Sequence, residues 1–232
     1  VPGRSFYLNG MHQKRKYYEE HVTEYVRCVQ KNLPALHDKK VGAIVMNCNP
    51  FTLGHQYLAE TAANQVDVLL LFVVEEDRSF FAFQDRIAMV REGTAHLKNV
   101  FVLPSGKMMI STVTFPGYFQ KEMPHAEDLD VSLDVSVFGA YIAEAFHITV
   151  RFVGEEPFDI VTRNYNESMK RLLPAYGVQV AEIPRKTSGG APISATRVRK
   201  LLKEKKLEAL KELVPESTYA CLKVRYTDIG RV

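Results

Sequence analysis

Residues 41–55 read VGAIVMNCNPFTLGH, and they indicate the fold class most clearly. The apolar run Val41–Met46 is rich in β-branched residues and predicts a short buried strand. Residues 47–50 combine two asparagines with a proline, which is a turn signal. A helix is predicted to follow over residues 54–64. A buried strand that leads through a short loop into a helix is typical of a parallel α/β sheet.

The same alternation continues along the chain. Further strands are predicted over residues 67–74, 99–103, 147–153 and 178–183. Helices are predicted over residues 84–97, 139–146 and 162–176, and from Ser194 towards Leu202. We therefore predict a Rossmann-like α/β fold with a parallel sheet and helices on both faces. Ligands of such sheets bind beyond the carboxyl ends of the strands, near the point where the strand order reverses.

The segment before the first strand has a different character. Apolar residues recur at helical spacing from residue 11 to 33, and Pro34 with the polar residues 37–40 ends the pattern. We predict that residues 1–40 form an N-terminal helical linker segment and that residues 41–232 form the α/β domain.

Composition excludes several classes of partner. The chain has 30 basic and 27 acidic residues, a balance that does not favour nucleic acid. No apolar run approaches the ~20 residues that span a bilayer. Neither the three dispersed cysteines nor the seven histidines show the spacing of metal ligands, so no protein-held metal is predicted. A polar, basic start and unpaired cysteines predict a cytoplasmic protein. Local basic clusters at residues 185–186 and 197–206 suit polyphosphate or an acidic partner, although the lysines near residue 205 also suit a solvated helix face.

The loop after the first strand suits an anion. Gly54 permits a close approach of the backbone, and His55 lies in the opening turn of the helix. Helix N-termini attract anions, and a histidine there can donate to phosphate oxygens. Transfer of an adenylyl group builds charge on the α-phosphate, which fixed donors stabilise. The loop is neither a P-loop nor a GxGxxG fingerprint.

A second anion site is predicted at residues 193–199, which read ISATRVR. Ser194 is a good N-cap, Thr196 lies in the first turn, and two arginines follow. Because Arg197 and Arg199 are two residues apart, they point to different faces, so at most one of them grips phosphate.

Together the two segments resemble the signatures of the nucleotidylyltransferase superfamily. Residues 52–55 resemble its (H/T)xGH motif, and residues 193–199 resemble ISSTxxR with Ala195 in place of the second serine. The resemblance implies that ATP is bound, that His55 and Thr52 stabilise the transferring phosphoryl group, and that the β- and γ-phosphates are held by Ser194, Thr196 and Arg199. It implies a nucleotide-binding surface that comprises Asn47, Asn49, Phe51, Gly54, Gly154, Glu155, Ile193 and Arg197.

A closer resemblance is to the citrate lyase ligase family, through residues 47–58, 80–86, 110–119 and 152–157. It implies an AMP-forming ligase that activates acetate with ATP and Mg²⁺ and acetylates the thiol of the citrate lyase acyl carrier protein. That family usually carries an acetyltransferase-like domain before this region, so the chain is expected to be part of a longer protein.

The turn-rich residues 104–137 interrupt the alternation and are predicted to shape the second-substrate pocket. Lys107 and Ser111 are candidates there to meet acetate or the thiol arm. Two other functions stay open at this point: an adenylyltransferase of cofactor biosynthesis that acts on pantetheine phosphate or a mononucleotide, and a carrier-binding module without catalysis.

Overall fold

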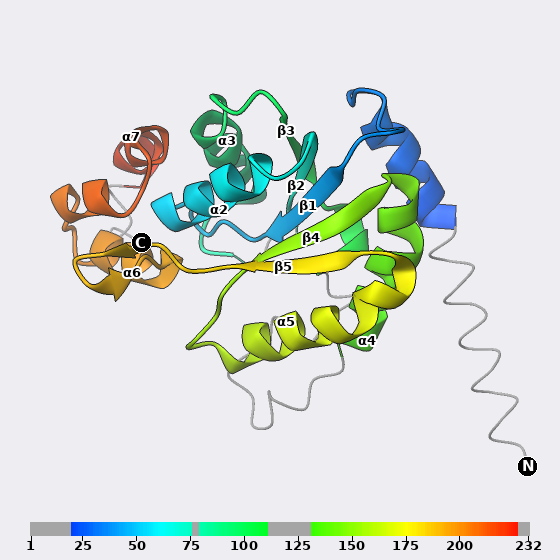
Figure 1. Ribbon diagram of the computed structural model, residues 1–232. Helices are drawn as coiled ribbons and strands as arrows, with labels where there is room; N and C mark the ends of the chain where they lie inside the picture. Colours follow the sequence, from blue (N-terminus) through cyan, green and yellow to red (C-terminus); the bar gives the residue numbers. More distant parts are fainter. Residues whose placement is uncertain (1–19, 76–78, 111–130, 227–232) are drawn as a thin grey trace, which may run out of the picture.

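The computed structural model describes residues 20–75, 79–110 and 131–226. Five parallel strands form one sheet in the order β3-β2-β1-β4-β5 (Figure 1). The strands are β1 (Val41–Met46), β2 (Val68–Val73), β3 (Val100–Pro104), β4 (Ile148–Gly154) and β5 (Gln179–Ile183). Each lies within one residue of its predicted bounds, so the predicted Rossmann-like parallel sheet is confirmed.

The strand order reverses in the middle of the sheet. β1 pairs with β2 on one side and with β4 on the other. The chain runs outward from β1 to β3, returns to β4 and ends the sheet at β5. The carboxyl ends of β1 and β4 therefore flank the crevice where sheets of this kind bind ligands.

Helices cover both faces of the sheet (Figure 1). One face carries α2 (Leu53–Ala63), α3 (Phe83–Gly93), α6 (Ala195–Lys203) and α7 (Glu216–Arg225). The other face carries a helix described over residues 20–30, α4 (Ser132–Val137) and α5 (Ile160–Leu172). Side chains of β1 alternate between the two faces. Ile44 packs in the core under α2, α3, α6 and α7, and Ala43 packs in the core under α4 and α5. No helix in the described part of the chain has the length and apolar character to cross a membrane.

The helix over residues 20–30 packs against the sheet. Val22 and Val29 are buried in the same core as β1, and the Tyr25 hydroxyl donates to the Pro104 carbonyl at 2.7 Å. Residues 11–19 of the predicted helix lie outside the described residues. The division of the chain at residues 40 and 41 stays a prediction.

Two helices show the clearest differences from their predicted bounds. The helix predicted from residue 139 begins at Ser132 as α4, and a π-helical stretch, Phe138–Ala143, continues it. A tertiary contact holds its first turn, because the Asp134 carboxylate accepts the Ile110 amide at 2.7 Å. The helix predicted to residue 97 ends at Gly93, where the Thr94 hydroxyl donates to the Val90 carbonyl at 2.8 Å and closes the last turn.

A short hairpin was not predicted. β6 (Thr187–Ser188) and β7 (Ala191–Pro192) pair in antiparallel fashion around Gly189 and Gly190, which have φ angles of 60° and 76°. A two-residue turn with positive φ at both positions favours glycine or asparagine, so the Gly-Gly pair in the sequence could have predicted this hairpin. The hairpin returns the chain to Ile193, whose amide donates to the Lys186 carbonyl at 3.1 Å. It thereby sets the start of α6.

Candidate active site

A buried arginine holds the loop after β1. Arg86 in α3 is fully buried, and its Nη1 donates to the carbonyl and side-chain oxygens of Asn47, both at 2.8 Å, and to the Val74 carbonyl at 2.7 Å. Its Nε donates to the Phe81 carbonyl at 3.0 Å. The loop ends of β1 and β2 are thus fixed by one planar guanidinium. The periodicity of the sequence did not predict this role, because an arginine inside a helix is usually exposed.

Thr52 and His55 form a capping box at the start of α2. The Thr52 hydroxyl accepts the His55 amide at 3.3 Å, and the Thr52 amide donates to His55 Nδ1 at 3.1 Å. The same hydroxyl lies 2.9 Å from Nδ1. Both contacts fix the imidazole over the first turn of α2. Thr52 itself is buried, so its side chain acts on the site through His55.

These contacts define which ring nitrogen of His55 carries the proton. A backbone amide can only donate, so Nδ1 is the acceptor and the proton of the neutral ring is on Nε2. Burial, and then the positive charge of Arg185, lower the pKa of His55 to about 4. At neutral pH the ring is therefore uncharged and presents an Nε2–H donor.

The Phe51 ring packs against the His55 ring. Its ring is fully buried and stacks on the His55 ring with centroids 5.9 Å apart and an interplanar angle of 15°. A Cβ at Gly93 would lie 2.5 Å from the Phe51 ring, so glycine at this place in α3 leaves the room that Phe51 occupies. Because the ring has no exposed surface, its contacts here are with the core and His55.

The two sequence motifs meet in the structure. A Cβ at Gly54 would lie 3.5 Å from the Ile193 carbonyl, so the start of α2 lies against the segment that leads into α6. Arg199 Nη1 donates to the Asn49 carbonyl at 2.5 Å, and its Nη2 donates to the Thr196 hydroxyl at 3.0 Å. The side-chain oxygen of Asn49 in turn accepts the Phe81 amide at 3.2 Å. The loop after β1 and the first turns of α6 thus form one surface.

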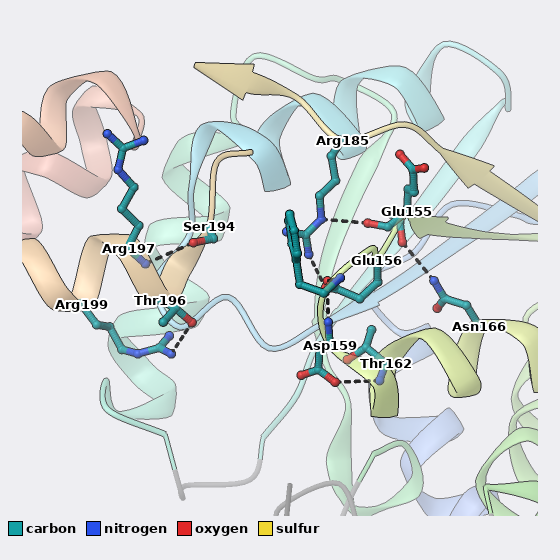
Figure 2. A network of polar contacts seen from close by, with 12 residues as sticks. Glu155, Glu156, Asp159, Thr162, Asn166, Arg185, Ser194, Thr196, Arg197 and Arg199 are labelled. Carbon is teal, nitrogen blue, oxygen red and sulfur yellow. Dashed lines mark hydrogen bonds and ion pairs between the residues drawn. The ribbon is translucent and has the colours of Figure 1, made fainter. Parts of the chain in front are cut away.

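The two arginines of α6 have different surroundings. Ser194 caps the helix by accepting the Arg197 amide at 3.1 Å, while the Arg197 side chain is exposed and points away from Arg199 (Figure 2). Arg199 is partly buried, and burial lowers its pKa, although a guanidinium stays charged at neutral pH. The predicted difference in orientation is confirmed, and Arg199 is the arginine directed to the β1 loop.

A clamp fixes the turn after β4 (Figure 2). Arg185, which follows β5, donates through Nε to the Glu155 carbonyl at 2.8 Å and forms an ion pair with Glu156. Glu156 also accepts the amides of Phe158 and Asp159, both at 3.1 Å. Asn166 in α5 donates to the Gly154 carbonyl at 3.0 Å. The Glu155 carboxylate remains exposed at the end of β4, beside β1. Arg185 therefore adds a cation that the sequence had suggested only as part of a basic cluster.

Of the two candidates for the second substrate, only Lys107 lies within the described residues. Lys107 is exposed in a 3-10 turn, η1 (Gly106–Met108), after the edge strand β3. Ser111 lies outside the described residues. In the described part of the chain, no three acidic, histidine or cysteine side chains group as metal ligands.

Fold and site define a Rossmann-like nucleotidyltransferase-type domain, in which two helix N-termini, a neutral histidine and partly buried arginines meet at the reversal of strand order. The model of the citrate lyase ligase C-terminal domain matches residues 41–222. The chain belongs to the citrate lyase ligase family.

Curated relatives agree with this assignment. The chain is 44% identical over 207 residues to the [Citrate [pro-3S]-lyase] ligase of Klebsiella pneumoniae, covering 88% of the chain and 60% of the relative. It is 44% identical over 184 residues to the protein of that name from Escherichia coli (strain K12), covering 77% of the chain and 52% of the relative. The chain thus spans between half and three fifths of the length of these relatives.

More distant proteins share parts of the chain or its fold. A phosphopantetheine adenylyltransferase of Streptococcus gordonii is 30% identical over 109 residues, which are 45% of this chain and 66% of that protein. The solved pantoate-beta-alanine ligase of Francisella tularensis, complexed with beta-gamma ATP and beta-alanine, superposes with a TM-score of 0.51 at 13% identity, covering 81% of this chain and 76% of that one. That likeness concerns the fold alone.

Proposed function

We propose that this chain catalyses AMP-forming activation of acetate and acetylates the thiol prosthetic group of the citrate lyase acyl carrier protein. Membership of the citrate lyase ligase family supports the reaction. The 44% identity to two curated ligases over most of the chain supports the substrates. Such a protein would act in the cytoplasm, where ATP and the carrier are found.

The reaction has two steps. An acetate oxygen forms a bond to the α-phosphorus of ATP, and the bond to the bridging β-phosphate oxygen breaks, so that pyrophosphate leaves with the electron pair. The carrier thiol then loses its proton to solvent, and its sulfur attacks the carbonyl carbon of acetyl-adenylate, releasing AMP. Mg²⁺ would enter on the phosphates of ATP rather than in a protein cage.

The observation that carries the proposal is the uncharged Nε2–H of His55 at the start of α2. Because Thr52 occupies Nδ1 and Phe51 supports the ring, the donor is held in place before substrate binds. A fixed donor that faces developing charge on the α-phosphate lowers the barrier without reorganisation. We propose that His55 contacts the transferring phosphoryl group, with Thr52 and Phe51 as positioning residues.

The helix N-terminus of α6 provides the second part of the phosphate site. We propose that Ser194, Thr196 and Arg199 hold the β- and γ-phosphates, because they gather around the first turn of α6 beside the loop after β1. Asn47, Asn49, Gly54 and Ile193 would form the backbone surface under the nucleotide. Gly154 and Glu155 would line its other side from the end of β4. The exposed Arg197 is assigned a lesser role at the rim.

The runner-up function is a cofactor-biosynthesis adenylyltransferase, which the partial match to phosphopantetheine adenylyltransferase favours. ATP–pyrophosphate exchange separates the functions when it is assayed with acetate, with pantetheine phosphate, and without an acceptor. We expect exchange only with acetate. Exchange that requires pantetheine phosphate would reject the ligase, and ATP binding without any exchange would favour a module that only binds the carrier.

A further inference from the structure

Arg151 is a buried cation outside the phosphate site. It lies on β4, opposite Ala43 of β1 and Val180 of β5, and only 2% of its surface is exposed. Its guanidinium lies over the Phe138 ring at 4.7 Å from the centroid. Nε and Nη1 have no hydrogen-bond partner within the described residues. Two donors of a buried charge are therefore unsatisfied.

Such an arrangement is costly for the folded protein. Buried guanidinium groups are almost always paired with acceptors, because their N–H groups lose water on burial. Burial lowers the pKa of Arg151, although Tyr165 and Asp134 lie close enough to act in the opposite direction. Yet the Asp134 carboxylate accepts the Ile110 amide at 2.7 Å and the Tyr165 hydroxyl at 2.5 Å. Nε and Nη1 of Arg151, which have no partner within the described residues, therefore suit an external anion.

The cluster is linked to the nucleotide side of the site. Tyr165 and Asn166 are neighbours in α5, and Asn166 donates to the carbonyl of Gly154 at 3.0 Å. Ile110, held by Asp134, directly precedes the segment that the sequence predicts to shape the second-substrate pocket. Arg151 itself is three residues before Gly154 on the same strand. Arg151 therefore lies on the strand whose carboxyl end flanks the crevice, and its guanidinium packs on the face of the sheet opposite α2 and α6.

We propose that Arg151 receives the carboxylate of the second substrate, a small monocarboxylate such as acetate. This inference rests on the proposed function and replaces Lys107 and Ser111 as the carboxylate contact. A planar guanidinium can hold one or both carboxylate oxygens in a fixed orientation. The buried apolar side chains of Met109, Ile110 and Val153 belong to the same core and suit a methyl group rather than a larger polar one.

Arg151→Lys tests the assignment, because a lysine retains the charge and loses the fork. In acetate-dependent ATP–pyrophosphate exchange, the KM for acetate should rise about 10–100-fold, as expected for a lost hydrogen bond to a charged group. The KM for ATP should stay within about twofold, since the phosphates contact other residues. Arg171→Lys, at an exposed arginine near the end of α5, is the matched control and should change neither value.

A second measurement uses the unchanged chain, so that a misfolded variant does not decide the result. The Nε–H resonance of Arg151 in ¹⁵N-labelled protein is followed while acetate is added in the presence of a non-hydrolysable ATP analogue. We expect a saturable shift with a midpoint near the kinetic KM, and no such shift with chloride at equal ionic strength.

The outcomes separate the two proposals. Exchange by the wild-type chain with an unchanged acetate KM in Arg151→Lys would overturn the Arg151 assignment alone. An Arg151 resonance that does not shift when acetate is added would also overturn the Arg151 assignment. It would mean that Arg151, Asp134 and Tyr165 have a structural role only. Absence of any acetate-dependent exchange by the wild-type chain would reject the proposed function and, with it, the inference about Arg151.

Discussion

Neighbouring residues fix the orientation and the tautomer of the His55 ring. The Thr52 amide and hydroxyl occupy Nδ1, and the Phe51 ring stacks on the imidazole. The sequence predicted the position of His55 at a helix start. It did not predict the tautomer, because the tautomer depends on the capping box in which the His55 side chain accepts the Thr52 amide. It also placed Phe51 against the nucleotide, whereas the fully buried ring is directed to His55.

The low pKa of His55 makes stability depend on pH. In the unfolded chain the ring has its ordinary pKa of 6.5, and in the folded protein the pKa is about 4. As pH falls from 6.5 towards 4, the unfolded state takes up a proton that the folded state does not, so the free energy of unfolding decreases. The full loss from this group is on the order of 3 kcal/mol.

Urea unfolding at pH 7 and pH 4.5 measures this effect. The comparison of wild type with His55→Gln isolates it, because glutamine keeps a polar side chain and does not titrate. We expect wild type to lose more stability than the variant on acidification. Equal losses in the two proteins would show that His55 titrates normally in the folded state.

At the scale of elements, α6 contributes to the site through one of its two arginines. Arg199 reaches the Asn49 carbonyl and Thr196, whereas Arg197 is exposed. Arg199→Lys should weaken ATP binding about tenfold or more, because a bidentate fork becomes a point charge. Arg197→Lys should weaken it less than about twofold. Calorimetric titration with ATP ranks the two variants, and the reverse ranking would contradict the assignment.

Arg86 joins three elements, since it bonds to the ends of β1 and β2 from inside α3. Arg86→Met should lower the free energy of unfolding by about 3–5 kcal/mol, because several buried carbonyls lose their donor. Arg91→Met, at an exposed arginine of the same helix, should change it by less than about 0.5 kcal/mol. Urea denaturation measures both. Similar small losses would mean that solvent replaces the buried guanidinium without cost.

Some helices and strands could be predicted from the sequence and others could not. The five strands were predicted because strands buried on both faces of a sheet form apolar runs. The start of α4 was hidden, since the contact from Asp134 to Ile110 is a tertiary one. α7 was also missed: its apolar residues do not form a clear stripe, and an ion pair between Arg225 and Asp85 fixes it to α3.

For the whole molecule, distant parts of the chain converge on the crevice between β1 and β4. The loop after β1 meets the start of α6, the clamp after β5 holds the turn after β4, and the Leu213 carbonyl accepts the Leu53 amide at 2.9 Å at the start of α2. The sequence predicted from their motifs that two segments bind phosphate, and the structure brings these segments together. It could not predict the buried positions of Arg86 and Arg151 or the Arg185 clamp, because these arrangements arise only when the strands are assembled.

We propose that this crevice transfers AMP to acetate with His55 as the donor to the α-phosphate. Acetate-dependent ATP–pyrophosphate exchange by wild type and His55→Ala is the measurement that tests this proposal. We predict exchange by wild type and a loss of roughly 10²–10³-fold in the variant, the usual cost of one such donor, with ATP binding largely retained. Near-normal exchange by folded His55→Ala, or exchange by wild type that does not depend on acetate, would contradict the account.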